Sequence, residues 1–440
     1  MADTGKHKNN TLKLYLGKLF SGIVARSLVV GAIAGAVTVA FRVCVTQVFS
    51  AAQKLAELAQ TQALMAVVWM GAILLAAFLV ARLLKWEPMI AGSGIPQLEG
   101  ELKGVFSHNP VKVLLGKFTG GLLSLGAGLS LGREGPCIQM GAAVGKGFSR
   151  RGDDEQKNLL MTGGGAAGLA AAFGAPLAGI LFALEEVHKS FSAKILFTSI
   201  AACATAGVVT RLLLGPAPIF SISLSQDVPL ADYWILVLLG VILGAMGALY
   251  NFSVQKMQDA YGKMKRIPAP YRVVVPFVAA GILAFVLPSI LGGGVPMVER
   301  MTSGSFTITV ALLLLAAKFI FSIFSFSSGV PGGILMPMIV IGALIGNAFG
   351  LMGTELFGLP AALTQNFIIF AMAGLFGAIV RAPLTGIVLV CEMTAAYDQF
   401  LPLIITTLSA YLMARLLRAK PVYDQLLDRD LSVLSHKKTA

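Results

Sequence analysis

The stretch LGREGPCIQM, residues 131–140, places an arginine and a glutamate side by side between two long apolar runs. Gly132, Gly135 and Pro136 surround this charged pair. Glycine lets a backbone approach a ligand closely, and proline suits the first turn of a helix. A charged side chain inside a membrane costs about 2.5–3.5 kcal/mol by insertion scales, so a glutamate there indicates a functional site. The stretch therefore predicts a broken helix with a function at the break.

The whole chain has the composition of an integral membrane protein. Of its 440 residues, 56% are hydrophobic and 12% are charged, which is about half the charged share of a soluble domain. Apolar stretches of bilayer length recur from start to end, and none alternates as a membrane β-barrel strand does. We therefore expect an all-α, polytopic membrane protein of about ten helices or more. The predicted stretches are residues 27–50, 62–84, 112–131, 158–184, 195–214, 233–252, 273–291, 308–325, 334–352, 366–390 and 400–417.

Basic residues gather before the first apolar stretch and after the last one. By the positive-inside rule, this distribution predicts that both termini are cytoplasmic. The net charge of +13 lies in tails and short loops, so topology and lipid headgroups explain it and no nucleic-acid partner is expected. The residues are Lys6, Lys8, Lys13 and Lys18 at one end and Arg415, Arg418, Lys420, Lys437 and Lys438 at the other.

Cysteines and histidines are scattered singly along the chain. No CxxC pair and no His/Cys/carboxylate group with metal-ligand spacing occurs, so we expect packing cysteines, no metal and no cofactor. The sequence also lacks a recognisable nucleophile and base set, so it is not expected to be an enzyme. The residues concerned are Cys44, Cys137, Cys203, Cys391, His7, His108, His188 and His436.

The chain follows one plan twice. APLAGILFALEE at 175–186 and APLTGIVLVCEM at 382–393 match at six of twelve positions, and upstream each half has a Gly/Pro break that opens an apolar helix. Matching interrupted helices point to a transport site near the bilayer midplane, although similarity alone leaves parallel and inverted repeats open. The predicted divisions are a cytoplasmic tail at 1–20, a first membrane repeat at 21–215, a second at 216–420, and a C-terminal helix and tail at 421–440.

Three breaks have the chemistry of an anion site. They are GSGIPQLEG at 92–100, GREGP at 132–136 and GVPGGILMP at 329–337. Each break leaves unpaired N–H groups at the positive end of a helix dipole, and such ends attract anions. Dipoles and neutral hydroxyls hold an ion loosely enough for it to leave again, as a transport pathway requires.

With these motifs in this order, the sequence resembles the CLC family of chloride channels and proton-coupled chloride transporters. The resemblance covers about residues 20–425 and rests on GSGIP, GREGP, the GGILMP form of the family's GxFxP motif and the tyrosine of KPVYDQLL. It implies inverted repeats with tilted and broken helices and a homodimer with one pathway per subunit. It also implies a multi-pass protein of the bacterial inner-membrane type, in contact with lipid, without cytoplasmic nucleotide-sensing domains.

The resemblance implies which residues bind the anion. Ser93 and Tyr423 match the family's two hydroxyl donors, with Gly94 in the same loop as Ser93, while the backbone amides of Ile334 and Leu335 complete the site. Leu335 stands where the family motif usually has phenylalanine, but the expected contact is a backbone N–H. The residues alone leave two other interpretations open, namely a helix cap for Ser93 and an anchor in the aromatic belt for Tyr423.

The resemblance also assigns the proton-transfer residues. Glu134 matches the gating glutamate, whose carboxylate mimics an anion and withdraws when protonated, and Glu186 matches the inner proton-transfer glutamate. A structural salt bridge with Arg133 is the competing interpretation for Glu134. For Glu185 and Glu186 the competing interpretation is a helix end in water. Four further cations are expected to snorkel or to brace loops, namely Lys117, Arg211, Lys318 and Arg381.

These features predict a transporter that exchanges chloride and similar halides for protons, with bound chloride as its substrate. A passive chloride channel of the same family, gated by voltage or pH, is the first alternative, and Glu186 argues against it. A fluoride/proton antiporter and a membrane-embedded enzyme are more distant alternatives. Ser93 and Tyr423 together favour chloride over fluoride.

Overall fold

The structure is a computed structural model that describes residues 3–150, 152–304 and 306–439. Helices account for the regular structure of these residues, and one isolated antiparallel bridge is the only β pairing among them. The first half contains α1 (Asp3–Thr61), α2 (Ala63–Trp86), α3 (Ile95–Leu102), α4 (Pro110–Gly126), α5 (Glu134–Gly147), α6 (Asp154–Phe173), α7 (Pro176–Phe182) and α8 (Ala193–Leu214). The second half contains α9 (Tyr233–Lys263), α10 (Val274–Val286), α11 (Val295–Thr302), α12 (Ile308–Ser327), α13 (Leu335–Phe357), α14 (Leu363–Val380), α15 (Pro383–Thr394) and α16 (Phe400–Leu416), followed by α17 (Val422–Thr439).

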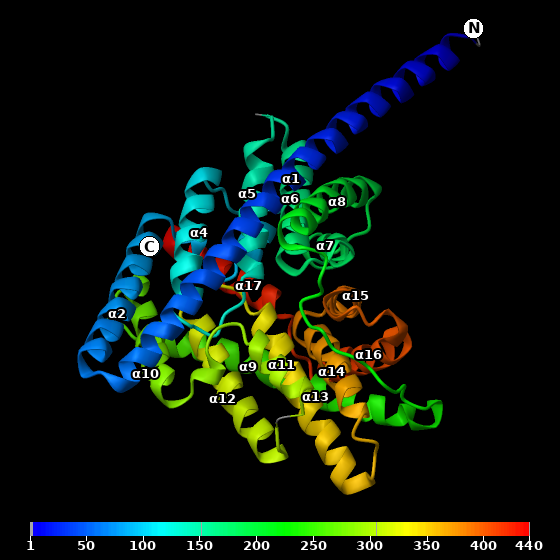
Figure 1. The fold of residues 1–440 in the computed structure, drawn as a ribbon. Coiled ribbons are helices and arrows are strands. Elements are labelled where there is room, and N and C mark those ends of the chain that lie inside the picture. Colours follow the sequence, from blue (N-terminus) through cyan, green and yellow to red (C-terminus); the bar gives the residue numbers. More distant parts are fainter. Residues whose placement is uncertain (1–2, 151, 305, 440) are drawn as a thin grey trace.

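The all-α membrane architecture is confirmed. Among the described residues, nine helices are long and apolar enough to cross a membrane. Figure 1 shows α5, α6 and α8 on one side of the centre and α13, α14 and α16 on the other, with α17 between them. Most of α13 and α14 is buried inside the protein, so these two helices form the core of the second half.

Two predicted spans are wrong, because the chain breaks inside them. The stretch 158–184 is divided between α6 and α7, and the stretch 366–390 between α14 and α15. At both breaks a residue in the left-handed region ends the first helix, Gly174 with φ +68° and Arg381 with φ +73°. A proline then opens the next helix. Hydropathy missed these breaks because the residues on both sides are apolar.

Buried lysines brace matching loops in the two halves. Lys117 and Lys318 are fully buried, and each donates to two backbone carbonyls of the loop that precedes a short helix. This confirms the bracing role for both residues. The bonds run from Lys117 Nζ to the oxygens of Ile90 (2.9 Å) and Gly92 (2.7 Å), and from Lys318 Nζ to those of Ile290 (2.8 Å) and Gly292 (2.6 Å).

Of the other two cations, Arg381 braces a loop as expected, whereas the position of Arg211 is compatible with snorkelling. Arg381 braces the chain near its end, since its guanidinium donates to the carbonyl oxygens of Tyr411 (3.3 Å) and Ala419 (2.8 Å). Arg211 is exposed in the last turn of α8, where a long side chain can reach the membrane surface.

Glycines let the backbones of α5 and α6 pack in direct contact. A Cβ atom on Gly141 would overlap the carbonyl of Gly164, and a Cβ on Gly164 would overlap the carbonyl of Gly141. Small residues at helix interfaces are the usual means of close packing in membranes, where lipid removes most of the hydrophobic drive for association. This contact fixes the position of α5, whose first residue is Glu134.

We therefore expect Gly141→Ala to destabilise the protein by about 1–3 kcal/mol, the usual cost of overpacking a tight contact. Gly147→Ala is the matched control in the same helix, because a Cβ there meets no atom within 4 Å. The control should unfold at or slightly above the wild-type temperature. Thermal unfolding of the purified protein in detergent measures both. Equal stability of the two variants would contradict the packing argument.

Candidate functional site

The three Gly/Pro breaks meet at one place. Gly132 and Gly333 exchange two backbone hydrogen bonds of 2.7 Å in the antiparallel bridge, which joins GREGP to the break before α13. Gly135 lies so close to Ser93 that a Cβ atom would overlap the serine backbone. The N-termini of α3, α5 and α13 therefore converge, and their N–H groups form a region of positive potential without a cation.

A second set of backbone bonds holds the loop that carries Ser93. The N–H of Gly92 donates to the carbonyl of Gly329 (3.1 Å), and the N–H of Gly332 donates to the carbonyl of Gly92 (2.9 Å). Gly94 has φ +89° and caps α3, and a Cβ there would overlap the side chain of Gln139. Only glycine fits both constraints without strain.

Two buried hydroxyls have spare hydrogen-bonding capacity. The Ser93 oxygen accepts the N–H of Ile95 (3.3 Å) at the start of α3, whose N-cap residue is Gly94, and the hydroxyl proton of Ser93 remains available to a ligand. Tyr423 is fully buried, and its hydroxyl has no partner among the described residues. Full burial does not fit an anchor at the membrane surface, and a buried hydroxyl without a partner among the described residues can donate to a ligand.

Residues at the start of α13 offer backbone donors. Ile334 is the N-cap residue and Leu335 is the first helical residue, and both are fully buried. The first N–H groups of a helix have no partner within it, which leaves them free for an anion. The side chain of Leu335 has little bearing on this expectation, because the expected contact is with its backbone N–H.

The Glu134 carboxylate reaches the helix end of the other half. It is fully buried, its Oε2 accepts the N–H of Met336 in the first turn of α13 (3.4 Å), and its Oε1 has no partner among the described residues. No ion pair between Arg133 and Glu134 occurs in the described part of the chain, so the salt-bridge interpretation has no geometric support. A negative group thus occupies an anion-attracting position.

Glu186 and Glu185 lie next to each other but in different surroundings. Glu186 is buried in a π-helical turn (Ala183–Val187), and its Oε1 has no partner among the described residues. Glu185 accepts the N–H groups of Leu384 (3.1 Å) and Thr385 (2.7 Å) at the start of α15, together with the Thr385 hydroxyl (2.8 Å). Neither residue is a helix end in water, contrary to the competing interpretation.

Glu392 is a structural residue that sequence reasoning missed. It accepts the N–H groups of Leu177 (3.1 Å) and Ala178 (2.8 Å) at the start of α7, which mirrors the cap that Glu185 places on α15. The signal was present, because Glu185 and Glu392 are the matched glutamates of the two twelve-residue segments. Each half thus closes a helix end of the other.

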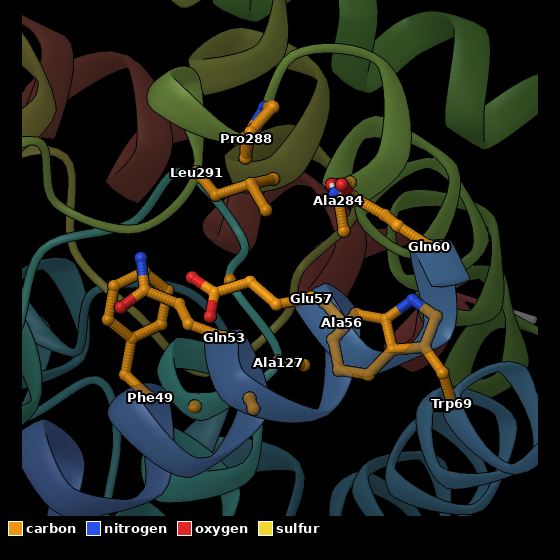
Figure 2. A pocket seen from close by; sticks show the side chains of 13 residues that line it. Phe49, Gln53, Ala56, Glu57, Gln60, Trp69, Ala127, Ala284, Pro288 and Leu291 are labelled. Atoms are coloured by element: carbon orange, nitrogen blue, oxygen red, sulfur yellow. Dashed lines mark hydrogen bonds between the residues drawn. The ribbon is translucent and has the colours of Figure 1, made fainter. Parts of the chain in front are cut away.

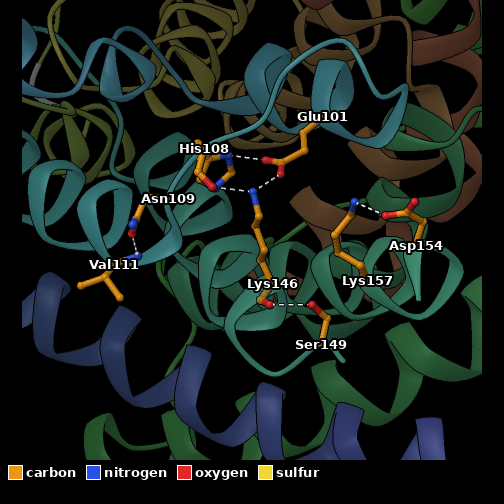
Figure 3. A network of polar contacts seen from close by, with 8 residues as sticks. All are labelled: Glu101, His108, Asn109, Val111, Lys146, Ser149, Asp154 and Lys157. Carbon is orange, nitrogen blue, oxygen red and sulfur yellow. Dashed lines mark hydrogen bonds and ion pairs between the residues drawn. The ribbon is translucent and has the colours of Figure 1, made fainter. Parts of the chain in front are cut away.

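A polar cluster joins the C-terminal ends of α3 and α5 (Figure 3). Glu101 forms ion pairs with His108 and Lys146, and Lys146 also donates to the His108 carbonyl. Burial opposes ionisation of Glu101, but hydrogen bonds and charges from His108 and Lys146 outweigh it and hold the pKa of Glu101 below its usual value. Sequence motifs did not predict this cluster, because Lys146 lies 38 residues from His108 and approaches it only through the packing of α5.

Two hollows of the structure are lined by other residues. One cavity of about 80 Å³ lies between α1, α2, α4 and α10, with Gln53 and Glu57 reaching into it from α1 and Trp69 at its edge (Figure 2). Another hollow, of about 300 Å³, is lined by polar residues of α9 and α17. Within the described ranges, no group of three or more histidines, cysteines or carboxylates could hold a metal ion.

Comparisons with known proteins agree with this geometry. Residues 72–415 match the family described as voltage gated chloride channel. The chain is 39% identical to the H(+)/Cl(-) exchange transporter ClcA of Cronobacter sakazakii, covering 91% of this chain and 88% of that protein. For ClcA of Klebsiella pneumoniae, the identity is 38%, covering 93% of this chain and 89% of that protein.

Solved structures show the same fold. A slow cyanobacterial Cl-/H+ antiporter superposes with a TM-score of 0.85 at 32% identity, covering 93% of this chain and 98% of that one. A CLC-type fluoride/proton antiporter superposes with a TM-score of 0.74 at 21% identity, covering 92% and 97% of the two chains, a likeness of fold alone. With its inverted repeat of broken helices, this chain belongs to the CLC family, which the matched description names as voltage gated chloride channels.

Proposed function

We propose that this protein is a secondary active transporter that exchanges chloride and similar halides for protons. The main support for this proposal is the position of the Glu134 carboxylate, because this acid lies buried against the first turn of α13, where an anion would bind. The relatives named H(+)/Cl(-) exchange transporter support the same activity. Chloride is the substrate, and the exchange needs no cofactor and no enzymatic step.

Competition for one position explains how the two ions are coupled. An ionised Glu134 accepts the N–H of Met336 and fills the anion position. Protonation removes the charge that holds the carboxylate at the helix end, so the side chain leaves and chloride takes its place. Chloride is then held by the backbone of Gly94, Ile334 and Leu335 and by the hydroxyls of Ser93 and Tyr423.

Glu186 provides the second proton station. It is buried within the same chain, and the neighbouring Glu185 is occupied with capping α15, which leaves Glu186 free to exchange a proton. Tyr423 lies within electrostatic reach of both Glu134 and Glu186, so a chloride path and a separate proton path would meet near this residue. A passive channel has no need for this second acid.

We also propose a homodimer whose two termini face the cytoplasm. The short helices α7 and α15 carry exposed Leu177 and Leu384, and neither helix is long enough to cross a bilayer. Backbone ends at membrane depth require protein cover, and a second copy of the chain would supply it. The basic residues at both ends support the orientation.

The proposed exchange is tested by reconstituting the protein in liposomes under a chloride gradient. The wild type should drive protons uphill, whereas Glu186→Gln should keep chloride flux, reduced, and lose proton pumping, because glutamine cannot bind and release a proton. Proton uptake and chloride release are recorded together with electrodes. Glu185→Gln is the matched control and should keep proton pumping. A wild type that moves chloride but no protons would establish the channel instead.

Replacing Glu134 with glutamine should mimic its protonated form. We expect chloride flux that no longer depends on pH, together with complete loss of proton coupling, since the competing negative charge is absent. Chloride efflux from liposomes at a series of pH values measures this. Arg133→Gln is the control for the salt-bridge interpretation and should retain pH-dependent coupled flux. Normal proton movement in Glu134→Gln would remove Glu134 from the mechanism.

Removing the Tyr423 hydroxyl should weaken chloride binding without unfolding the protein. A net hydrogen bond contributes about 0.5–1.5 kcal/mol, so Tyr423→Phe should raise the Kd for chloride about 2- to 10-fold, and Ser93→Ala should act alike. Calorimetric titration with chloride measures the change. Tyr250→Phe is the matched control, because Tyr250 is equally buried but bonds to Ser322 (2.9 Å). Unchanged affinity in Tyr423→Phe would overturn the assignment.

A further inference from the structure

Lys189 connects two helices that are remote in sequence. Its Nζ donates to Glu99 Oε1 on α3 (3.2 Å) and forms an ion pair with Asp424 on α17. The side chain of Glu99 is 3% exposed, so its carboxylate depends on such partners for compensation. Lys189 therefore ties the end of α3 to the start of α17.

The three connected segments are those that carry the proposed site. Ser93 lies two residues before the start of α3, Tyr423 lies next to Asp424 on α17, and Glu186 lies three residues before Lys189. Lys189 thus belongs to the segment that carries Glu186, and its side chain contacts the two segments that carry the hydroxyls of Ser93 and Tyr423. Gln97 on α3 also donates to Asp430 on α17 (3.3 Å), but this bond does not include the segment that carries Glu186.

The backbone at Lys189 also indicates a purpose for its side chain. Its φ is +51°, in the left-handed region that favours glycine. Two hydrogen bonds close the turn. The N–H of His188 donates to the carbonyl of Ala183 (3.1 Å), and the N–H of Ser190 donates to the carbonyl of Leu184 (3.1 Å). Glycine would satisfy this turn with less strain, so the lysine side chain supplies something that the turn itself does not need.

Lys189 carries a stable positive charge. Burial opposes its protonation, but the hydrogen bond to Asp424 and the negative charges of Glu186, Glu99 and Asp424 outweigh burial and raise the pKa of Lys189 above its ordinary value. The ammonium therefore stays charged throughout the range in which carboxylates titrate.

The charged groups that face Glu186 are one cation and three carboxylates. Lys189 contributes a positive charge, whereas Asp424, Glu99 and Glu185 contribute negative charges from α17, α3 and the π-helical turn. From α6, Thr162 bonds to His188 (2.6 Å). Lys103 also pairs with Glu99 (2.8 Å), but its side chain is 55% exposed and contacts neither Asp424 nor Glu186 in the pairs described for this region.

We propose that Lys189 is a positioning residue for proton transfer, which holds α3 and α17 together beside Glu186 and sets the pH at which Glu186 takes up a proton. The inference rests on the proposed exchange of chloride for protons. Without the ammonium, three negative neighbours remain, so a proton binds Glu186 at higher pH.

The test follows the protonation of Glu186 directly. Infrared difference spectra of the full-length protein are recorded against pH, and the carbonyl band of protonated Glu186 is identified by its loss in Glu186→Gln. In Lys189→Met the pH midpoint of this band should rise by about half a pH unit to one pH unit. This is a small shift for the loss of a neighbouring charge, because water screens the half-exposed lysine. The shift should shrink in concentrated salt.

Three further variants complete the design. Lys189→Gly should show the same shift in a folded protein, because glycine suits the left-handed turn, and Lys189→Arg should restore the wild-type midpoint because it keeps the charge. Lys103→Met, which removes only the exposed partner of Glu99, should leave the midpoint unchanged. In liposomes, the pH dependence of proton transport should move with the infrared midpoint.

Each outcome decides one question. An unchanged midpoint in both Lys189→Met and Lys189→Gly overturns the role of Lys189, whatever the transport assay shows. An equal shift in Lys103→Met would also overturn it, since any cation near Glu99 would then suffice. A shifted midpoint in a protein that pumps no protons supports the role of Lys189 and contradicts the proposed exchange, so the two failures are distinguishable.

Discussion

The reciprocal pair of hydrogen bonds between Gly132 and Gly333 is the constraint on which the site depends. Because the two segments pair antiparallel and each leads directly into a helix, α5 and α13 start together and run in opposite directions (Figure 1). Two positive helix ends therefore face one point at the centre of the protein. The same pairing brings the Glu134 carboxylate of the first half within reach of Met336 in the second.

Residues that repeat in both halves build the frame, and residues that differ form the proposed site. The bracing lysines recur as Lys117 and Lys318, and the capping glutamates recur as Glu185 and Glu392. Three side chains of the proposed site have apolar or small counterparts instead. These pairs are Ser93 with Gly293, Glu134 with Leu335, and Glu186 with Met393. A symmetric scaffold thus carries an asymmetric pathway, as a directional exchange of two different ions requires.

Much of this arrangement could be predicted from the sequence, because its signals are local. The break at GREGP, the second break at GVPGG and the matched segments are all visible as short motifs. The breaks after Gly174 and Arg381 were missed, since hydropathy does not record backbone conformation. Contacts such as Glu101 with Lys146, or Lys189 with Asp424, depend on how distant helices pack, and no spacing in the sequence encodes them.

The placement of the buried lysines follows from what a transport site must avoid. A cation in contact with chloride would bind it too tightly for release, whereas backbone N–H groups and hydroxyls offer weaker, more easily exchanged contacts. The Nζ atoms of Lys117 and Lys318 donate to loop carbonyls, which stabilises the loops. These donors are therefore occupied by the protein rather than directed at the anion. The converging N-termini of α3, α5 and α13 supply the potential that attracts the anion. The fold thereby attracts an anion to the centre while leaving only neutral donors to touch it.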